Sequence, residues 1–126
     1  MNKKGQVLVF FVILIPMLLA IAAFAIDVGY SFYQSNKLHS ITHMALKYGL
    51  NHPDDPDLRA KIIDLIYKND SKIDSYELVI EDNKITITTN KTVDSIFGKA
   101  LNIDFYYISA KYVGYIKNNK IVIEKG

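Results

Sequence analysis

Apolar residues are concentrated near the N-terminus of this chain. From residue 7 to residue 26 the sequence reads VLVFFVILIPMLLAIAAFAI, a run of 20 residues without a charged side chain. A helix rises about 1.5 Å per residue, so this run spans roughly 30 Å, the thickness of the hydrocarbon core of a bilayer. Because only a helix or a closed barrel satisfies every backbone group in lipid, residues 7–26 are predicted to be a transmembrane helix.

The charges on either side of this run predict its orientation. Lys3 and Lys4 precede it, Asp27 follows it, and the next basic residue is Lys37. Since basic residues stay on the cytoplasmic side, we expect residues 1–6 in the cytoplasm and the C-terminus outside it. The chain is therefore predicted to be a single-pass protein of the cell membrane, with membrane lipid as one of its partners.

A secretory signal peptide is the alternative interpretation of the same segment. The basic start, the apolar run and the small residues Ala23 and Ala25 on either side of Phe24 are all features of such a signal. The run is longer than the usual apolar core of about 7–15 residues, and a helical pattern continues beyond it. A retained anchor is therefore favoured, whereas cleavage near Ala25 would release a secreted soluble effector.

The residues after the apolar run continue a helical pattern. Residues 27–50 place apolar side chains three, four or six positions apart without a proline, which predicts an amphipathic stem continuous with the membrane helix. Pro16 is expected to bend this long helix because proline removes one backbone hydrogen bond, and Gly29 is a second weak point. Gly49 and Pro53 are expected to end it.

Residues 51–126 are predicted to form a small extracytoplasmic head. A second helix is expected to begin near Asp55 as N-cap, with Pro56 at its first position, and to run to about Tyr67. Alternating residues predict four strands over residues 76–81, 84–89, 105–116 and 120–124, with turns at 82–83 and 117–120 and a short helix within 92–103. So small a head has only a marginal core, so the stem is expected to pack on the antiparallel sheet. The predicted fold class is α+β.

Composition and motifs exclude several classes of function. Without Lys3 and Lys4 the 15 basic residues fall to 13, equal to the 13 acidic ones, and no basic run marks a nucleic-acid surface. The chain has no cysteine, and therefore neither a disulfide nor a thiolate site. It contains no phosphate-binding loop, no G-x-S-x-G and no HExxH motif. We therefore predict no enzymatic activity, no catalytic residues and no cofactor.

Two clusters of metal-type ligands are interpreted as ordinary structure. His39 and His43 lie one helical turn apart, a spacing that can hold zinc, but no third ligand is indicated. Asp54, Asp55 and Asp57 lack the glycine and the terminal glutamate of a calcium loop, and instead suit the start of a helix. No metal site is predicted.

Two features are candidate contact surfaces. Tyr106, Tyr107, Tyr112 and Tyr115 fall in one predicted strand, where they form either half-buried sheet packing or a docking face. Asp27 stands where the helix leaves the bilayer. It either fixes that boundary through lipid headgroups or contacts a basic group on a partner helix.

Several short motifs occur together along the chain. They are KKGQ at residues 3–6, the apolar run with Pro16, AIDVGY at 25–30, a helix with Leu38 and Ala45, ITIT at 85–88, IFGKAL at 96–101 and ISAK at 108–111. This combination resembles the TadE/TadG-like proteins of tight-adherence (Flp) pilus systems. The resemblance covers most of the chain and is more specific in its N-terminal part.

The resemblance implies a pilin-like fold and a structural or assembly role in a type IVb-related pilus or secretion system. Its implied partners are other pilin-like or pilus-assembly subunits, in a homo- or hetero-oligomer. It also implies a candidate prepilin-peptidase cut between Gly5 and Gln6, which would place Phe10 where pilins usually have glutamate, and it marks Asp27 and Gly29 as a membrane-exit contact. The alternative is a membrane-anchored extracytoplasmic sensor or ligand-binding module, which needs a well-formed pocket in the head.

Overall fold

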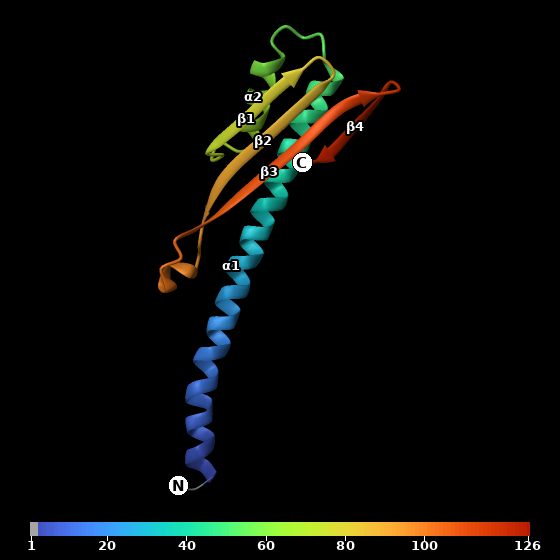
Figure 1. Cartoon of the computed structure of the whole chain (residues 1–126). Coiled ribbons are helices and arrows are strands. Elements are labelled where there is room, and N and C mark those ends of the chain that lie inside the picture. The colour runs from blue at the N-terminus through green and yellow to red at the C-terminus, as the bar shows by residue number, and fades with distance from the viewer. Residues whose placement is uncertain (1–2) are drawn as a thin grey trace.

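The computed structural model describes residues 3–126, without the side chain of Leu101, and shows a long helix bearing a small sheet at one end (Figure 1). The elements are α1 (Lys3–Asn51), α2 (Leu58–Asn69), β1 (Ser75–Glu81), β2 (Lys84–Asp94), the 3-10 helix η1 (Gly98–Leu101), β3 (Phe105–Lys117) and β4 (Lys120–Lys125). The predicted α+β class, with a long N-terminal helix packed on a small antiparallel sheet, is confirmed.

Helix α1 is one unbroken element of 49 residues, which at about 1.5 Å per residue is roughly 73 Å long. Pro16 lies inside it without interrupting it, and the helix ends at Asn51, two residues before Pro53. The N-terminal half projects away from the head (Figure 1). No residue of its most apolar stretch is buried, and the helix is long and apolar enough to cross a membrane.

The four strands form an antiparallel meander in the order β1-β2-β3-β4. A two-residue turn at Asp82 and Asn83 joins β1 to β2, as predicted. The turn between β3 and β4 uses Asn118 and Asn119, whose φ angles are 54° and 62°. Tight hairpins favour this left-handed pair because its twist matches that of the strands, and asparagine tolerates it.

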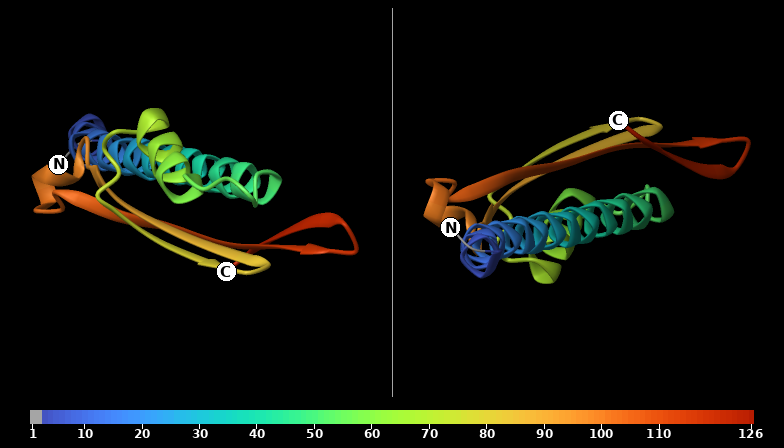
Figure 2. Two further views of the ribbon diagram at one scale, coloured as in Figure 1. Left: turned by 90° about the horizontal axis from the view of Figure 1, so that it is seen from above. Right: turned by 90° about the horizontal axis from the view of Figure 1, so that it is seen from below.

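Both helices cover the same face of the sheet, and the opposite face has no covering layer (Figure 2). The alternation along β2 follows from this arrangement. Ile85, Ile87 and Thr89 are buried beneath the helices, whereas Thr86 and Thr88 point to the other face and are only half-buried. The predicted division of this strand into an inner and an outer side is therefore confirmed.

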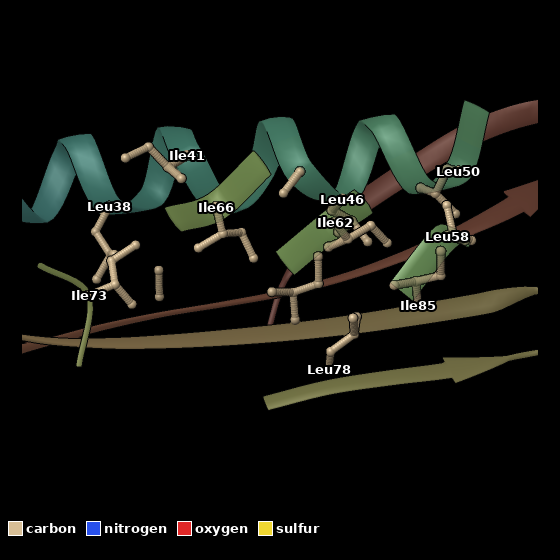
Figure 3. Packing of buried hydrophobic residues seen from close by; sticks show 13 residues of the cluster. Leu38, Ile41, Leu46, Leu50, Leu58, Ile62, Ile66, Ile73, Leu78 and Ile85 are labelled. Carbon is tan, nitrogen blue, oxygen red and sulfur yellow. The ribbon is translucent and has the colours of Figure 1, made fainter. Parts of the chain in front are cut away.

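The core lies between the C-terminal half of α1, α2 and the inner face of the sheet (Figure 3). Its fully buried aliphatic side chains are Leu38, Leu46, Ile62, Ile66 and Ile87. A buried hydrogen bond of 2.7 Å between the hydroxyl groups of Thr42 and Thr89 also joins α1 to β2. The expectation that the stem completes the core of the head is confirmed.

The predicted start of the second helix is wrong. Asp57, not Asp55, occupies the N-cap of α2, and it makes no side-chain capping bond. The Asp55 carboxylate instead accepts hydrogen bonds from the Asp57 N–H at 2.9 Å and the Lys61 ammonium at 2.6 Å. Aspartate commonly bonds to the backbone two residues ahead, so Asp55 stabilises a turn that delays the helix to Leu58.

The short helix predicted within residues 92–103 is also partly wrong. Val93 continues β2, where it is buried and pairs with Tyr106 of β3, and only Gly98–Leu101 form a 3-10 turn. The helical spacing of Val93, Ile96 and Phe97 is incidental. Strand pairing with β3 extends to Asp94, because the long partner strand satisfies backbone groups that a single helical turn would leave free.

Gly114 lies where the sheet comes close to α1 and provides a test of this packing. A Cβ atom added there would lie 2.5 Å from Leu50 Cδ1 and 3.0 Å from Leu46 Cγ. Both leucines are buried, so we expect Gly114→Ala to lower the free energy of unfolding by about 1–3 kcal/mol, through overpacking. Urea unfolding of the full chain in detergent micelles, followed by near-UV circular dichroism, measures this change.

The matched control is Gly29→Ala, because an added Cβ at Gly29 meets nothing within 4 Å. Alanine favours a helix over glycine by about 1 kcal/mol, so this variant should lose no stability. An equal loss in the two variants would contradict the proposed close contact.

Candidate functional site

Asp27 is the ionisable residue at which the apolar half of α1 meets the head. Its side chain is only 2% exposed. The carboxylate accepts hydrogen bonds from the backbone N–H of Ile96 at 2.7 Å and of Phe97 at 3.0 Å, and from the Tyr106 hydroxyl at 3.5 Å. The loop between β2 and β3 is thereby tied to α1, about halfway along the helix (Figure 1).

Local hydrogen bonds give this loop the shape that presents its N–H groups to Asp27. The Ser95 hydroxyl donates to the Ile103 carbonyl at 2.6 Å, and the Ile103 N–H donates to the Gly98 carbonyl at 2.9 Å. Asn102 ends η1 in the left-handed conformation, with φ 62°. The loop is closed on itself by its own backbone, so two successive amides remain available to the stem carboxylate.

Gly98 is required by this geometry. A Cβ atom added there would lie 2.8 Å from the Ile103 carbonyl oxygen and 3.2 Å from Asp27 Oδ2. Neither neighbour is the end of a flexible chain free to move away. Any larger residue would therefore push the loop from the carboxylate or open the turn.

Below Asp27 the loop and the helix enclose a cavity of about 180 Å³. Besides Asp27, its lining comes from Ala20, Ala23 and Phe24 of α1 and from Phe97, Gly98, Ala100, Ile103 and Tyr106 of the head. Ala20 precedes Asp27 by seven residues, or about 10 Å along the helix. The loop therefore runs beside the last turns of the apolar segment rather than ending at its edge.

The two residues predicted to form the membrane-exit contact have different surroundings. Asp27 has its partners within its own chain, in the loop before η1. Gly29 lies two residues further, roughly 200° around the helix, with open space where its side chain would be. The predicted cut site, Gly5 and Gln6, lies in the first turns of α1, and Phe10 is exposed one turn later.

The four tyrosines of the predicted docking strand are divided between the two faces of the sheet. Tyr106 and Tyr112 point toward α1, and both make polar contacts with it. Tyr107 is 77% exposed on the other side, and Tyr115 donates a hydrogen bond of 3.1 Å to Glu124 of β4. The four tyrosines therefore lie two on each face of the sheet and do not share a single docking face.

His39 and His43 lie against the same tyrosine. The rings of both meet Tyr112 edge-on, with centroids 5.5 and 5.7 Å away, and His39 Nδ1 is 3.0 Å from the Tyr112 hydroxyl. Burial lowers the pKa of His39, and the positive charge of Lys125 lowers it further. Within residues 3–126, no group of three or more histidine, aspartate or glutamate side chains could hold a metal ion.

A buried ion pair that the sequence analysis missed joins three elements. The Lys91 ammonium of β2 lies 2.5 Å from Asp70 Oδ2, after α2, and 2.8 Å from Gln34 Oε1 of α1. Burial raises the pKa of Asp70, but the hydrogen bonds from Lys91 and the Lys72 N–H outweigh it, so this pKa lies below its ordinary value. Lys91 occupies an inward-facing position of β2. The alternation of inward and outward residues along this strand was the signal in the sequence that could have indicated its burial.

This ion pair forms one wall of a polar cavity of about 400 Å³ between the stem and β2. Lys37, Lys68 and Lys72 also line it. The Lys91 ammonium is already paired and is therefore not available to a ligand. The polar groups that remain available in this cavity belong mainly to exposed side chains.

Comparison with protein-family models, with curated proteins and with solved structures finds no match to this chain.

Removing the Asp27 carboxylate should release the loop without unfolding the head. We expect Asp27→Ala to speed amide hydrogen exchange in the peptide covering residues 95–104 by about tenfold, because hydrogen bonds to a charged acceptor are lost. Exchange is measured by mass spectrometry on the full chain in micelles. Asp104→Ala is the control, since that exposed side chain lies in the same loop. Equal protection of residues 95–104 from exchange in the Asp27→Ala and Asp104→Ala variants would contradict the contact between Asp27 and the loop.

The lowered pKa of His39 predicts a pH dependence of stability. The unfolded chain binds this proton more tightly than the folded one does. The neutral His39 side chain therefore contributes fully to the free energy of unfolding above pH 6.5, the ordinary pKa of histidine. This contribution is lost as the pH falls from 6.5 toward the lower pKa that His39 has in the folded chain. We expect His39→Asn to flatten this part of a plot of unfolding free energy against pH. An unaltered slope in His39→Asn would contradict the assignment.

Proposed function

We propose that this chain is a pilin-like structural or assembly subunit of a tight-adherence type of pilus or secretion system. The N-terminal half of α1 anchors it in the cell membrane, and the head is displayed outside the cytoplasm. The observation that carries the proposal is the division of α1 into a bare apolar rod and a half that completes the core of the head.

The bare rod requires a dry environment. No side chain of the apolar run is buried, and Leu8, Val12 and Leu19 are each about two-thirds exposed. A bilayer or a bundle of similar helices satisfies such a surface equally well, because both lack water. A subunit that rests in lipid and then packs among other helices fits this property, as the resemblance to TadE/TadG-like proteins implies.

One side of the rod is suited to close helix packing. Leu18, Ala22, Ala25 and Gly29 all lie within about 40° of the direction opposite Asp27, at 100° per residue. Three of these four residues are small, and small residues let two helices approach closely in a membrane. The head loop covers the other side, so this side is the one left free for another subunit.

The orientation of the subunit is proposed from its charges. Lys3 and Lys4 precede the apolar run, and from Asp27 onward the chain carries equal numbers of basic and acidic residues. Basic residues remain in the cytoplasm, which places the head outside.

A sensor or ligand-binding module has a single observation in its favour, the polar cavity beside Lys91. There Asp70 and Gln34 already satisfy the buried ammonium. A ligand would have to displace these partners or bind exposed lysines alone. The structural role is therefore better supported.

The test is site-specific photo-crosslinking in the native cells. With p-benzoylphenylalanine in place of Leu18, we expect irradiation to join the chain to a second copy or to another single-span subunit. The same group in place of Thr88, on the outer face of the sheet, is the matched control and should give far less of this product. Crosslinks from Leu18 to lipid alone would contradict a subunit role.

Orientation can be checked in the same cells because the chain has no cysteine. A membrane-impermeant maleimide should label Asn83→Cys in the head of intact cells and should not label Gln6→Cys. The opposite pattern would reverse the proposed topology.

A further inference from the structure

We propose that the loop between β2 and β3, residues 95–104, is a second lipid contact, inserted into the outer leaflet beside α1. This inference rests on the membrane anchoring in the proposed function. It adds that the head does not stand clear of the bilayer but is seated in its surface.

The loop and the start of β3 expose a cluster of large apolar side chains. The members of this cluster are Ile96, Phe97, Ile103, Phe105 and Tyr107, exposed by between 42% and 77%. The rings of Phe105 and Tyr107 meet edge-on with centroids 5.0 Å apart, and exposed apolar groups gathered in this way normally mark a contact surface. Within the part of the chain that the structure describes, these side chains keep much of their surface exposed, so a partner for that surface comes from outside the fold.

The position of the loop along α1 identifies that partner as lipid. Phe97, Ala100 and Ile103 line a cavity together with Ala20 and Phe24, which lie within the apolar run. If residues 7–26 span the hydrocarbon core, the loop lies at the same depth as their last two turns. Interfacial elements typically enter the headgroup and acyl boundary by about 5–10 Å, which matches the roughly 10 Å between Ala20 and Asp27.

Asp27 makes this insertion possible. A free carboxylate and two free backbone amides would each be costly at the edge of the hydrocarbon. Here the carboxylate accepts the N–H groups of Ile96 and Phe97, so each satisfies the other within the protein. The charge that ends the apolar run in the sequence is therefore no barrier to lipid on the remaining sides of the helix.

The apolar surface of the stem continues past Asp27. Val28, Phe32 and Tyr33 are all exposed, with Phe32 at 67%. The stretch from residue 7 to Tyr33 is about 40 Å long at 1.5 Å per residue, close to a bilayer with its headgroup regions at about 40–45 Å. Lipid can therefore surround both the loop and this part of the stem.

Polar groups mark the outer limit of this surface. Gln34 and Lys37 follow Tyr33 on the stem and line the polar cavity, which Asp94 reaches from the base of the loop. Tyr107 lies near the limit, as tyrosines do at the edge of a bilayer. Lys99 is exposed on η1, and its long stem lets the ammonium reach lipid phosphates.

The test uses single cysteines labelled with the fluorophore NBD in the full chain. The chain is reconstituted at low density in phosphatidylcholine vesicles, in parallel preparations that carry a doxyl quencher either near the headgroup or deep in the acyl chains. Ile96→Cys and Tyr107→Cys report the loop, and Leu18→Cys reports the anchor. Ile121→Cys, an exposed apolar position in β4 at the far end of the head, is the matched control.

We expect doxyl lipid to quench the probes at residues 96, 107 and 18, and to leave the probe at 121 unquenched but accessible to aqueous iodide. Quenching at 18 with iodide-accessible probes at 96 and 107 would overturn the loop insertion alone. No lipid quenching at 18 would overturn the membrane anchor and this inference together. Loop probes shielded from both quenchers would show that a second protein copy covers the loop, which also overturns the inference.

Discussion

The C-terminal half of α1 packs on the inner face of the sheet, and the arrangement of every other element follows from that contact. Leu38, Leu46 and Leu50 supply part of the core, and Gly114 lets the sheet approach closely enough to meet them. A head of this size has little apolar surface of its own to bury. Because the same helix continues without a break into the apolar rod, the packing also sets the direction in which the head is held.

The junction at Asp27 adds a second tie between rod and head. Core packing alone would hold the top of the stem, while the β2–β3 loop would extend freely beside it. The two amides bound to Asp27 draw this loop against the helix below the core. A head fixed at two levels is restrained from swinging on its stem, and such rigidity suits the proposed role of a subunit that presents one face to its neighbours.

Much of the fold could be predicted because its signals are local. The turns at residues 82–83 and 118–119, the alternation in the strands and the end of α1 before Pro53 all depend on neighbours in the chain. One error arose from a local competition for the same carboxylate, and the other arose where a partner on a separate strand decides. Asp55 was expected to cap α2 and instead supports a preceding turn, and Val93 was assigned to a helix although its pairing with Tyr106 keeps it in β2.

The sequence by itself determined that this chain has a long apolar helix and a small antiparallel sheet, because both are expressed in periodic patterns along the chain. It also singled out Asp27 as an unusual charge. Only the tertiary structure decided which groups bind the Asp27 carboxylate. Its partners Ile96 and Phe97 lie about seventy residues away, and they contribute backbone N–H groups, which no side-chain pattern reveals. The pairing of Lys91 with Asp70 was decided in the same way, by elements that meet only when the sheet and helices assemble.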